Sequence, residues 1–208
     1  MNSKHVFINC PFDDAYYPLL KGIFFTLLYL NFKPKIAETS DSGDIRLIKI
    51  KDLMMDSKLS IHDLSRIDPL HTNEYPRMNM PFECGIDFGL KLSGLNGYSE
   101  KKFLILEKET YRYRKVLSDI SGNDIRAHQN DTEQVVKAVR DWIRVFSNSI
   151  PRHREIYLAL NEFTGFYEDT LENENYDPSS ITALTFSDTL EIMMDWIKKY
   201  KKFRSNPS

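Results

Sequence analysis

Cysteine is scarce in this sequence, with Cys10 and Cys84 the only two among 208 residues. Two cysteines cannot form the disulfide framework of a small secreted domain. Neither has a cysteine or histidine companion at metal-ligand spacing, and neither has an activating base nearby in the sequence, so a zinc site and a thiol nucleophile are not expected. We expect both thiols to be small buried packing groups.

Long apolar runs and an excess of one charge are also lacking. The longest apolar stretch lies within residues 23–30, far short of the roughly 20 residues of a membrane span. The first residues show no signal-peptide pattern. The formal net charge of −2 gives no field that would hold nucleic acid or an anionic membrane. These absences predict a cytoplasmic protein that binds neither a membrane nor, directly, nucleic acid.

Glycine-rich phosphate-binding loops are missing as well. None of the eight glycines belongs to a Gly-x-Gly-x-x-Gly or Walker-type motif. Hydride transfer on a standard dinucleotide site and P-loop phosphoryl transfer therefore lose their main sequence support.

Short apolar runs alternate with helical patterns over the first 150 residues. The apolar runs cover residues 5–9, 32–37, 59–64, 102–106 and 124–128, and the helical patterns cover 13–30, 44–57, 81–93 and 132–146. This alternation predicts an α/β domain, residues 1–150, with a parallel five-stranded sheet and helices on both faces. Two further helical patterns, about 152–172 and 185–201, predict a helical C-terminal extension over residues 151–208.

Local patterns give more detailed expectations for two of these helices. Asp13 and Asp14 are placed to cap the helix that follows the first strand. In the pattern of residues 44–57, we expect Ile45, Ile48 and Met55 to face the core. The basic residues 198–204 are expected to be a solvated tail, and we assign them no chemistry.

Polar residues gather where strands end and helices begin. These candidate ligand-binding residues are Asn9, Cys10, Pro11, Phe12 and Asp13 after the first strand, Asp63, Ser65 and Arg66 after the third, and Met80, Phe82 and Glu83 near the next helix start. Ligands of parallel sheets bind beyond the carboxyl ends of the strands. Backbone N–H groups at helix starts can hold phosphate or ribose oxygens. The pattern therefore predicts a cleft for a nucleotide-like small molecule.

Glu83 is the candidate catalytic residue. We expect it in the first turn of a helix that starts at Pro81, where the helix dipole keeps a carboxylate anionic and Met80 and Phe82 exclude water. A carboxylate facing an anomeric carbon can stabilise, or attack, the oxocarbenium-like transition state of N-glycosidic cleavage. The alternative is an acid that merely complements the helix dipole.

Several neighbouring residues carry two readings each. Asp63 either binds a ribose hydroxyl or orients the base, or it forms a turn with Ser65. His62, which strand alternation points away from Asp63, is either an acid or base or, more simply, a satisfied polar group. Asp87 is either a second carboxylate or an exposed helix acid. Arg46, with Lys49, either binds phosphate or lies on a solvated helix face.

These residues resemble those of two related families. The strand Val6-Phe7-Ile8-Asn9 and the acidic pair that follows resemble the opening of TIR domains. The run Pro81-Phe82-Glu83-Cys84-Gly85 resembles the helix start that carries the catalytic glutamate in TIR-like and nucleoside 2-deoxyribosyltransferase-like proteins. The resemblance covers about residues 5–146 and implies a flavodoxin-like (TIR-like) fold with Glu83 as the catalytic glutamate.

The same resemblance implies a biological role. It implies a hydrolase whose substrate is NAD or a related nucleoside or nucleotide, with no cofactor. It also implies a bacterial antiviral-defence effector that assembles as a homo-oligomer or with a partner defence protein. The sequence departs from the families at Asn9-Cys10-Pro11, where Ser-Tyr is usual, and in the long loop of residues 66–80, which lacks their usual Trp. These departures weaken the expectation that NAD is the substrate more than they weaken the expectation of glycosidic cleavage.

Two hypotheses of different classes follow. The first is an enzyme, a TIR-like N-glycosidase with Glu83 as its catalytic carboxylate. The second is a non-catalytic module that senses a nucleotide or assembles with partners, since a fold alone does not settle function.

Overall fold

A computed structural model describes residues 1–38, 43, 45–69 and 75–205. The chain forms two compact units. The first unit holds Met1–Pro11 and Lys33–Asn130, and the second holds Phe12–Phe32 and Asp131–Ser208. The domain boundary expected after residue 150 stays a prediction. Residues 70–74 of the expected long loop, residues 39–42 and the expected helix start at residue 44 lie outside the described residues.

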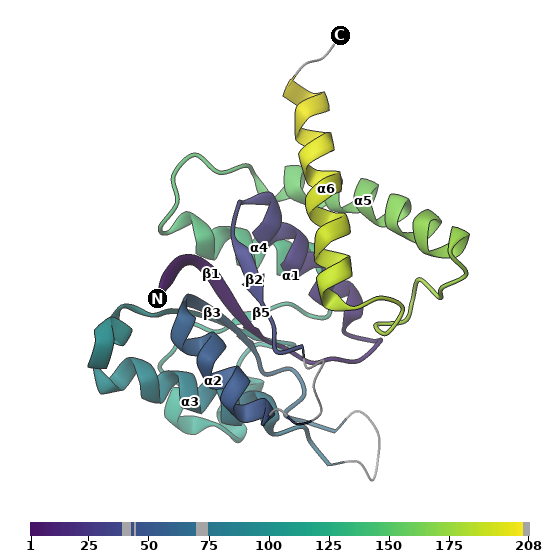
Figure 1. Cartoon of the computed structure of the whole chain (residues 1–208). Helices are drawn as coiled ribbons and strands as arrows, with labels where there is room; N and C mark the ends of the chain where they lie inside the picture. Colours follow the sequence, from purple (N-terminus) through teal and green to yellow (C-terminus); the bar gives the residue numbers. More distant parts are fainter. Residues whose placement is uncertain (39–42, 44, 70–74, 206–208) are drawn as a thin grey trace. The chain divides into compact units, whose positions relative to one another are not determined.

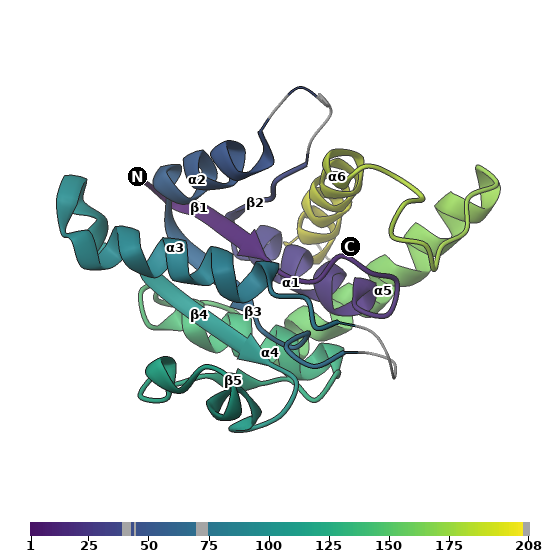
Figure 2. The ribbon, with the colours of Figure 1, turned by 90° about the horizontal axis from the view of Figure 1, so that it is seen from below.

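The first unit is built on a five-stranded parallel sheet. The strands are β1 (Asn2–Asn9), β2 (Lys33–Lys35), β3 (Ser57–Asp63), β4 (Lys102–Glu107) and β5 (Arg126–Ala127). Their order is β2-β1-β3-β4-β5, and every neighbouring pair is parallel. Figure 2 shows β1 and β4 running in the same direction. This is the flavodoxin-like strand order, whose ligands bind where β1 and β3 diverge, so the predicted α/β fold class is confirmed.

Two helices of the first unit pack against β1 and β3. They are α2 (Arg46–Asp56) and α3 (Asn79–Ser93), which lie beside each other in Figure 1. Three short 3-10 helices complete the unit: η1 (Leu95–Glu100), η2 (Arg112–Lys115) and η3 (Ser118–Ile120). As the sequence predicts, α3 ends at Gly94, whose φ of 65° is the left-handed conformation that glycine adopts without strain.

The core-facing side of α2 differs from the prediction. Ile45 and Ile48 are 65% and 50% exposed, whereas the buried residues of α2 are Ile50 and Met54. These two residues, four apart, pack with Phe7. Ile50 follows Ile48 by two residues, or about 200° around a helix, so the two point in nearly opposite directions. The expectation for Ile45 and Ile48 is therefore wrong.

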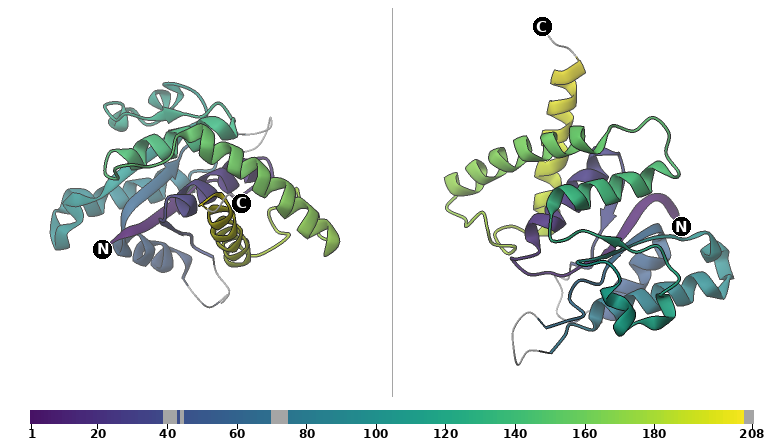
Figure 3. Two further views of the ribbon diagram at one scale, coloured as in Figure 1. Left: turned by 90° about the horizontal axis from the view of Figure 1, so that it is seen from above. Right: turned by 180° about the vertical axis from the view of Figure 1, so that it is seen from behind.

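The second unit is helical and contains both helices expected near the C-terminus. Its members are α1 (Tyr17–Tyr29), α4 (Thr132–Arg144), α5 (His153–Asn173) and α6 (Phe186–Ser205), shown in two further views in Figure 3. Helix α1 contacts the other three. The ring of Phe25 on α1 lies against Phe163 and Trp196 at centroid distances of 5.5 and 5.9 Å. Aromatic pairs of this kind stabilise the fold by more than the buried apolar area alone would.

The residues before α1 do not cap it in the expected way. Asp13 Oδ1 accepts a hydrogen bond from the Tyr16 N–H, one residue before the helix begins, and Asp14 Oδ1 accepts one from the Ile181 N–H. Asp13 thus shapes the turn that leads into α1. Within the described ranges, no helix combines the length and the apolar character that crossing a membrane requires.

Candidate functional site

The first turn of α3 is held at the end of β1 by Asn9. The Asn9 side chain is buried, and its Nδ2 donates to the Met80 carbonyl at 2.9 Å and to His62 Nδ1 at 3.1 Å. An amide nitrogen only donates, so His62 Nδ1 accepts and the ring hydrogen lies on Nε2. That Nε2 donates to Asp87 Oδ2 at 3.2 Å. Asn9, expected at the ligand, therefore uses its amide to fix α3, and His62 is a satisfied polar group, as predicted.

Asp87 is the centre of a fully buried ionic network. Its Oδ1 lies 3.0 Å from Nζ of Lys101, the residue before β4, and neither side chain is exposed to solvent. Lys101 Nζ also donates to the carbonyls of Met54 and Ser57, both at 2.7 Å. Lys101 Nζ thus has two hydrogen-bond acceptors and one ion-pair partner. The network joins the end of α2, the middle of α3 and the start of β4.

The pKa of Asp87 is lowered by this network. Burial raises the pKa of the carboxyl, but the hydrogen bond from His62 and the charge of Lys101 outweigh it. Asp87 therefore stays ionised inside the unit. The expectation of an exposed helix acid is wrong, because the sequence does not show that Lys101 is buried against the same helix.

Asp63, at the end of β3, points the other way from His62, as strand alternation predicts. Its Oδ1 accepts a hydrogen bond from the Ser65 N–H at 2.8 Å, which confirms the expected turn. Its Oδ2 lies 3.1 Å from Nε2 of His128, and both side chains are fully buried. His128 was not predicted as a site residue, because its only signal in the sequence is its position at the end of the last apolar run.

Glu107 and Arg112 form a second ionic pair at the carboxyl edge of the sheet, which was also missed. Glu107 is the buried last residue of β4, and Arg112 reaches it with Nε at 3.0 Å and Nη2 at 2.6 Å. Arg112 also donates to the Ser65 carbonyl at 2.7 Å and pairs with Asp68 at 3.0 Å. Such two-point contacts fix geometry as well as charge. Arg112 therefore ties the segment after β3 to the end of β4.

Glu83 differs from these carboxylates in having no such partner. It lies on α3 and is half-buried, and it makes no hydrogen bond or ion pair with any residue in the described part of the chain. Because α3 begins at Asn79, Glu83 lies in the second turn rather than the first. Burial raises the pKa of Glu83, with the Arg46 charge opposing the rise. The expected first-turn position is therefore wrong, and burial rather than the helix dipole sets the direction of this pKa shift. That Glu83 is anionic stays a prediction.

Arg46 is the cation that acts on Glu83. It opens α2, is exposed, and donates through Nη1 to the Ala37 carbonyl at 2.9 Å. Lys49, one turn later, donates to the Glu38 carbonyl. The structure thus brings Arg46 within electrostatic range of Glu83, and its role in phosphate binding stays a prediction.

The other predicted ligand-binding residues lie in three settings. Cys10, Pro11, Ser65, Arg66 and Met80 are buried. Phe12 and Asp13 belong to the second unit, where the Phe12 ring lies 5.5 Å from that of Phe186. Phe82 is 59% exposed, so the expectation that it keeps water from Glu83 is wrong.

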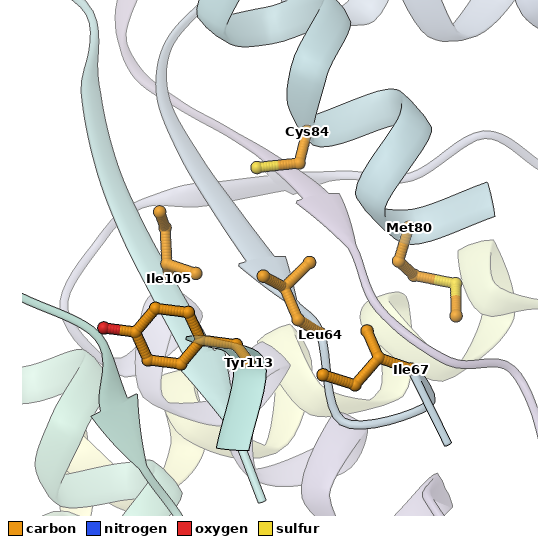
Figure 4. Packing of buried hydrophobic residues seen from close by; sticks show 6 residues of the cluster. All are labelled: Leu64, Ile67, Met80, Cys84, Ile105 and Tyr113. Carbon is orange, nitrogen blue, oxygen red and sulfur yellow. The ribbon is translucent and has the colours of Figure 1, made fainter. Parts of the chain in front are cut away.

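Met80 and Cys84 line the inner face of α3. They pack in a cluster with Leu64, Ile67, Ile105 and Tyr113 (Figure 4). Burial, followed by the charge of Asp87, raises the pKa of the Cys84 thiol to about 12. A thiol that resists ionisation is a poor nucleophile, so the prediction of a packing group is confirmed.

Comparisons with protein-family models, with curated proteins and with solved structures found no match. Among the described residues, no three His, Cys, Asp or Glu side chains gather in a way that could hold a metal ion. The candidate group that the described residues offer is the half-buried carboxyl of Glu83, within electrostatic range of Arg46.

Proposed function

We propose that this chain is a TIR-like N-glycosidase that cleaves the base–ribose bond of NAD or a related nucleotide, with Glu83 as the catalytic carboxylate. One observation carries the proposal. Asp63, Asp87 and Glu107 are all engaged by internal partners, whereas Glu83 has no recorded partner among the described residues. A carboxyl kept partly dehydrated and unpaired costs stability, and such groups are typical of functional sites.

The chemistry suits the position of Glu83. When the glycosidic bond breaks, its electron pair leaves with the base nitrogen and positive charge develops at C1′ and the ring oxygen of the sugar. A partly dehydrated carboxylate stabilises that charge more strongly than a hydrated one. Water then adds to C1′ and gives up a proton, completing the hydrolysis. Arg46 offers a guanidinium for a phosphate of the substrate.

Phe82, the residue before Glu83, supports the proposal from another side. It is an exposed aromatic ring, and such rings stack with bases. The role as a cytoplasmic antiviral-defence effector, acting as a homo-oligomer or with a partner protein, rests on the TIR resemblance alone.

The test is release of free base. The purified chain is incubated with NAD and with a panel of nucleosides and nucleotides, at low and high protein concentration, and products are separated by chromatography. We expect release by the wild type and a loss of about 100-fold or more in Glu83→Gln, which keeps the shape but removes the charge. Asp52→Asn, an exposed carboxylate on α2, is the matched control and should retain full activity.

Two results would contradict the proposal. One is equal release by the wild type and Glu83→Gln. The other is no release from any compound at any concentration, including after addition of candidate partner proteins, because TIR-type assembly can be required for activity.

A non-catalytic nucleotide-sensing or assembly module is the second candidate. It is favoured because Asp63, Asp87 and Glu107 are engaged by internal partners. Of these three carboxyls and Glu83, only Glu83 is then free for acid–base or nucleophilic chemistry. Calorimetric titration with the same panel separates the two, because a sensor binds a nucleotide that it never cleaves.

A further inference from the structure

Helix α1 of the second unit carries a buried lysine that lines a pocket. Lys21 is 7% exposed. The pocket, of about 330 Å³, is lined by Asp14, Tyr17, Pro18, Lys21, Glu168, Asp177, Pro178 and Ser179; we call it the α1 pocket. Its volume is at the lower end of the range of small-molecule sites.

The Lys21 amine has unusual surroundings for a buried cation. Its Nζ lies 4.8 Å from the ring centre of Tyr17 and 5.6 Å from that of Tyr167. It makes no hydrogen bond or ion pair with any residue that the structure describes. The two tyrosine hydroxyls are 3.1 Å apart, and the Tyr167 hydroxyl also lies 3.1 Å from that of Thr189. The hydroxyls thus pair with each other and with Thr189, and neither forms a hydrogen bond with the Lys21 amine.

Two other lysines show what a structural role looks like. Lys101 is buried with two carbonyl acceptors and the carboxylate of Asp87 as its ion-pair partner, and Lys201 donates to the Tyr29 carbonyl at 2.6 Å. Lys21 is as buried as a structural lysine but has none of these partners. An amine in this state can offer its lone pair to an electrophile once it loses its proton.

We propose that Lys21 is a carbonyl-reactive amine that forms an imine with a small uncharged aldehyde or ketone in the α1 pocket. The amine nitrogen attacks the carbonyl carbon to give a carbinolamine, which loses water as the C=N bond forms. No oxidant or cofactor is needed. Burial lowers the pKa of Lys21, against the opposing charge of Glu168, so the neutral amine is more accessible than on an ordinary surface lysine.

The carboxylates of the pocket divide into two kinds. Asp14 accepts from the Ile181 N–H, and Asp177 accepts from the N–H and hydroxyl of Ser179. Glu168 is exposed and its charge acts on Lys21, so we assign it the proton transfers that accompany loss of water. Three carboxylates also disfavour an anionic ligand, which restricts the carbonyl compound to uncharged or cationic ones.

The test labels the intact wild-type chain and needs no variant to fold. The protein is treated at pH 7 with limiting propionaldehyde and cyanoborohydride, which traps imines, and modified lysines are mapped by peptide mass spectrometry. We expect Lys21 to react about 10-fold faster than the exposed Lys199, and Lys101 to react slowest. If Lys21 reacts no faster than Lys199, the amine is merely packed and the proposal fails.

Two further arms probe the pocket itself. With anionic glyoxylate in place of propionaldehyde, the rate at Lys21 relative to Lys199 should fall several-fold, and an unchanged ratio would contradict the charge argument. Glu168→Gln has two opposed effects on Lys21: it removes a charge that raises the pKa of Lys21, which favours labelling, and it removes the proposed proton carrier, which slows labelling. We expect the second effect to dominate, with labelling of Lys21 several-fold slower and Lys199 unaffected. Labelling of Lys21 as fast as in the wild type, or faster, would remove Glu168 from the mechanism.

Discussion

Two carboxyl groups on α3, one helical turn apart, differ in their partners and in the direction of their pKa shifts. Asp87 is fully buried and paired with His62 and Lys101, and its pKa is lowered. Glu83 is half-buried with no recorded partner among the described residues, and its pKa is raised. Both sit on one helix, and the dipole of that helix does not decide between them. What separates them is the presence of partners from β3 and from the residue before β4.

The difference suggests two roles along α3, one in positioning the helix and one in chemistry. The Asp87 network and the Asn9 bond to the Met80 carbonyl fix the helix against β1, β3 and β4. A reactive group is useful only when its supporting elements are rigid. Asp87 is therefore a positioning residue in this account, and Glu83 is the group that it helps to place.

The largest expected effect is loss of stability when Asp87 loses its charge. Asp87→Asn leaves the Lys101 ammonium buried without a counter-charge, which typically costs about 3–5 kcal/mol. Urea unfolding should be followed by hydrogen exchange of β3 and α3 peptides, because both tryptophans, Trp142 and Trp196, belong to the second unit.

The matched control for that change is again Asp52→Asn, which should alter stability by no more than about 0.5 kcal/mol. The double variant Asp87→Leu with Lys101→Met should recover only part of the loss, since an apolar pair can replace a buried ion pair but His62 Nε2 loses its acceptor. A cost below about 1 kcal/mol for Asp87→Asn would show that the network does not hold α3.

A smaller effect of opposite sign is expected for Glu83→Gln. Because the folded-state pKa of Glu83 is raised above 4.5, its contribution to stability is fully present below pH 4.5 and is lost as pH rises through the folded pKa. Glutamine avoids that loss, so Glu83→Gln should be more stable than the wild type at pH 7, by about 0.5–1 kcal/mol. The gain should vanish below pH 4.5 in the same unfolding measurement.

Asp87 gives the contrasting pH profile. Its folded-state pKa is lowered below 3.8, so its stabilisation is present above pH 3.8 and is lost as pH falls through the folded pKa. If Glu83→Gln is less stable than the wild type at pH 7, Glu83 belongs with Asp87 among the structural carboxylates.

Local patterns in the sequence predicted part of the fold and part of the candidate site. The alternation of strands and helices predicts the parallel sheet, Gly94 predicts the end of α3, and the Asp63–Ser65 turn and the opposite facing of His62 follow from neighbours in the chain. The phase of α2 did not follow, because its apolar residues allow two faces and packing against Phe7 selects one.

The ionic networks could not be read from the sequence. Asp63 with His128 and Asp87 with Lys101 are partners brought together by the order of strands, and no local signal marks them. The Glu107–Arg112 pair is only five residues apart, but the segment between them has no regular periodicity that predicts its turn. Glu83 was singled out from its neighbours in sequence, whereas its lack of a partner is visible only in three dimensions.

The most direct test of the contrast is the site-specific pKa of the two carboxyls in the folded chain. Side-chain carboxyl ¹³C shifts can be followed against pH by NMR and assigned with Glu83→Gln and Asp87→Asn. The account predicts that Glu83 titrates above its ordinary pKa of 4.5 and Asp87 below its ordinary pKa of 3.8. Glu83 titrating at or below 4.5 would contradict the claim that α3 holds one paired carboxylate and one unpaired, dehydrated carboxyl suited to chemistry.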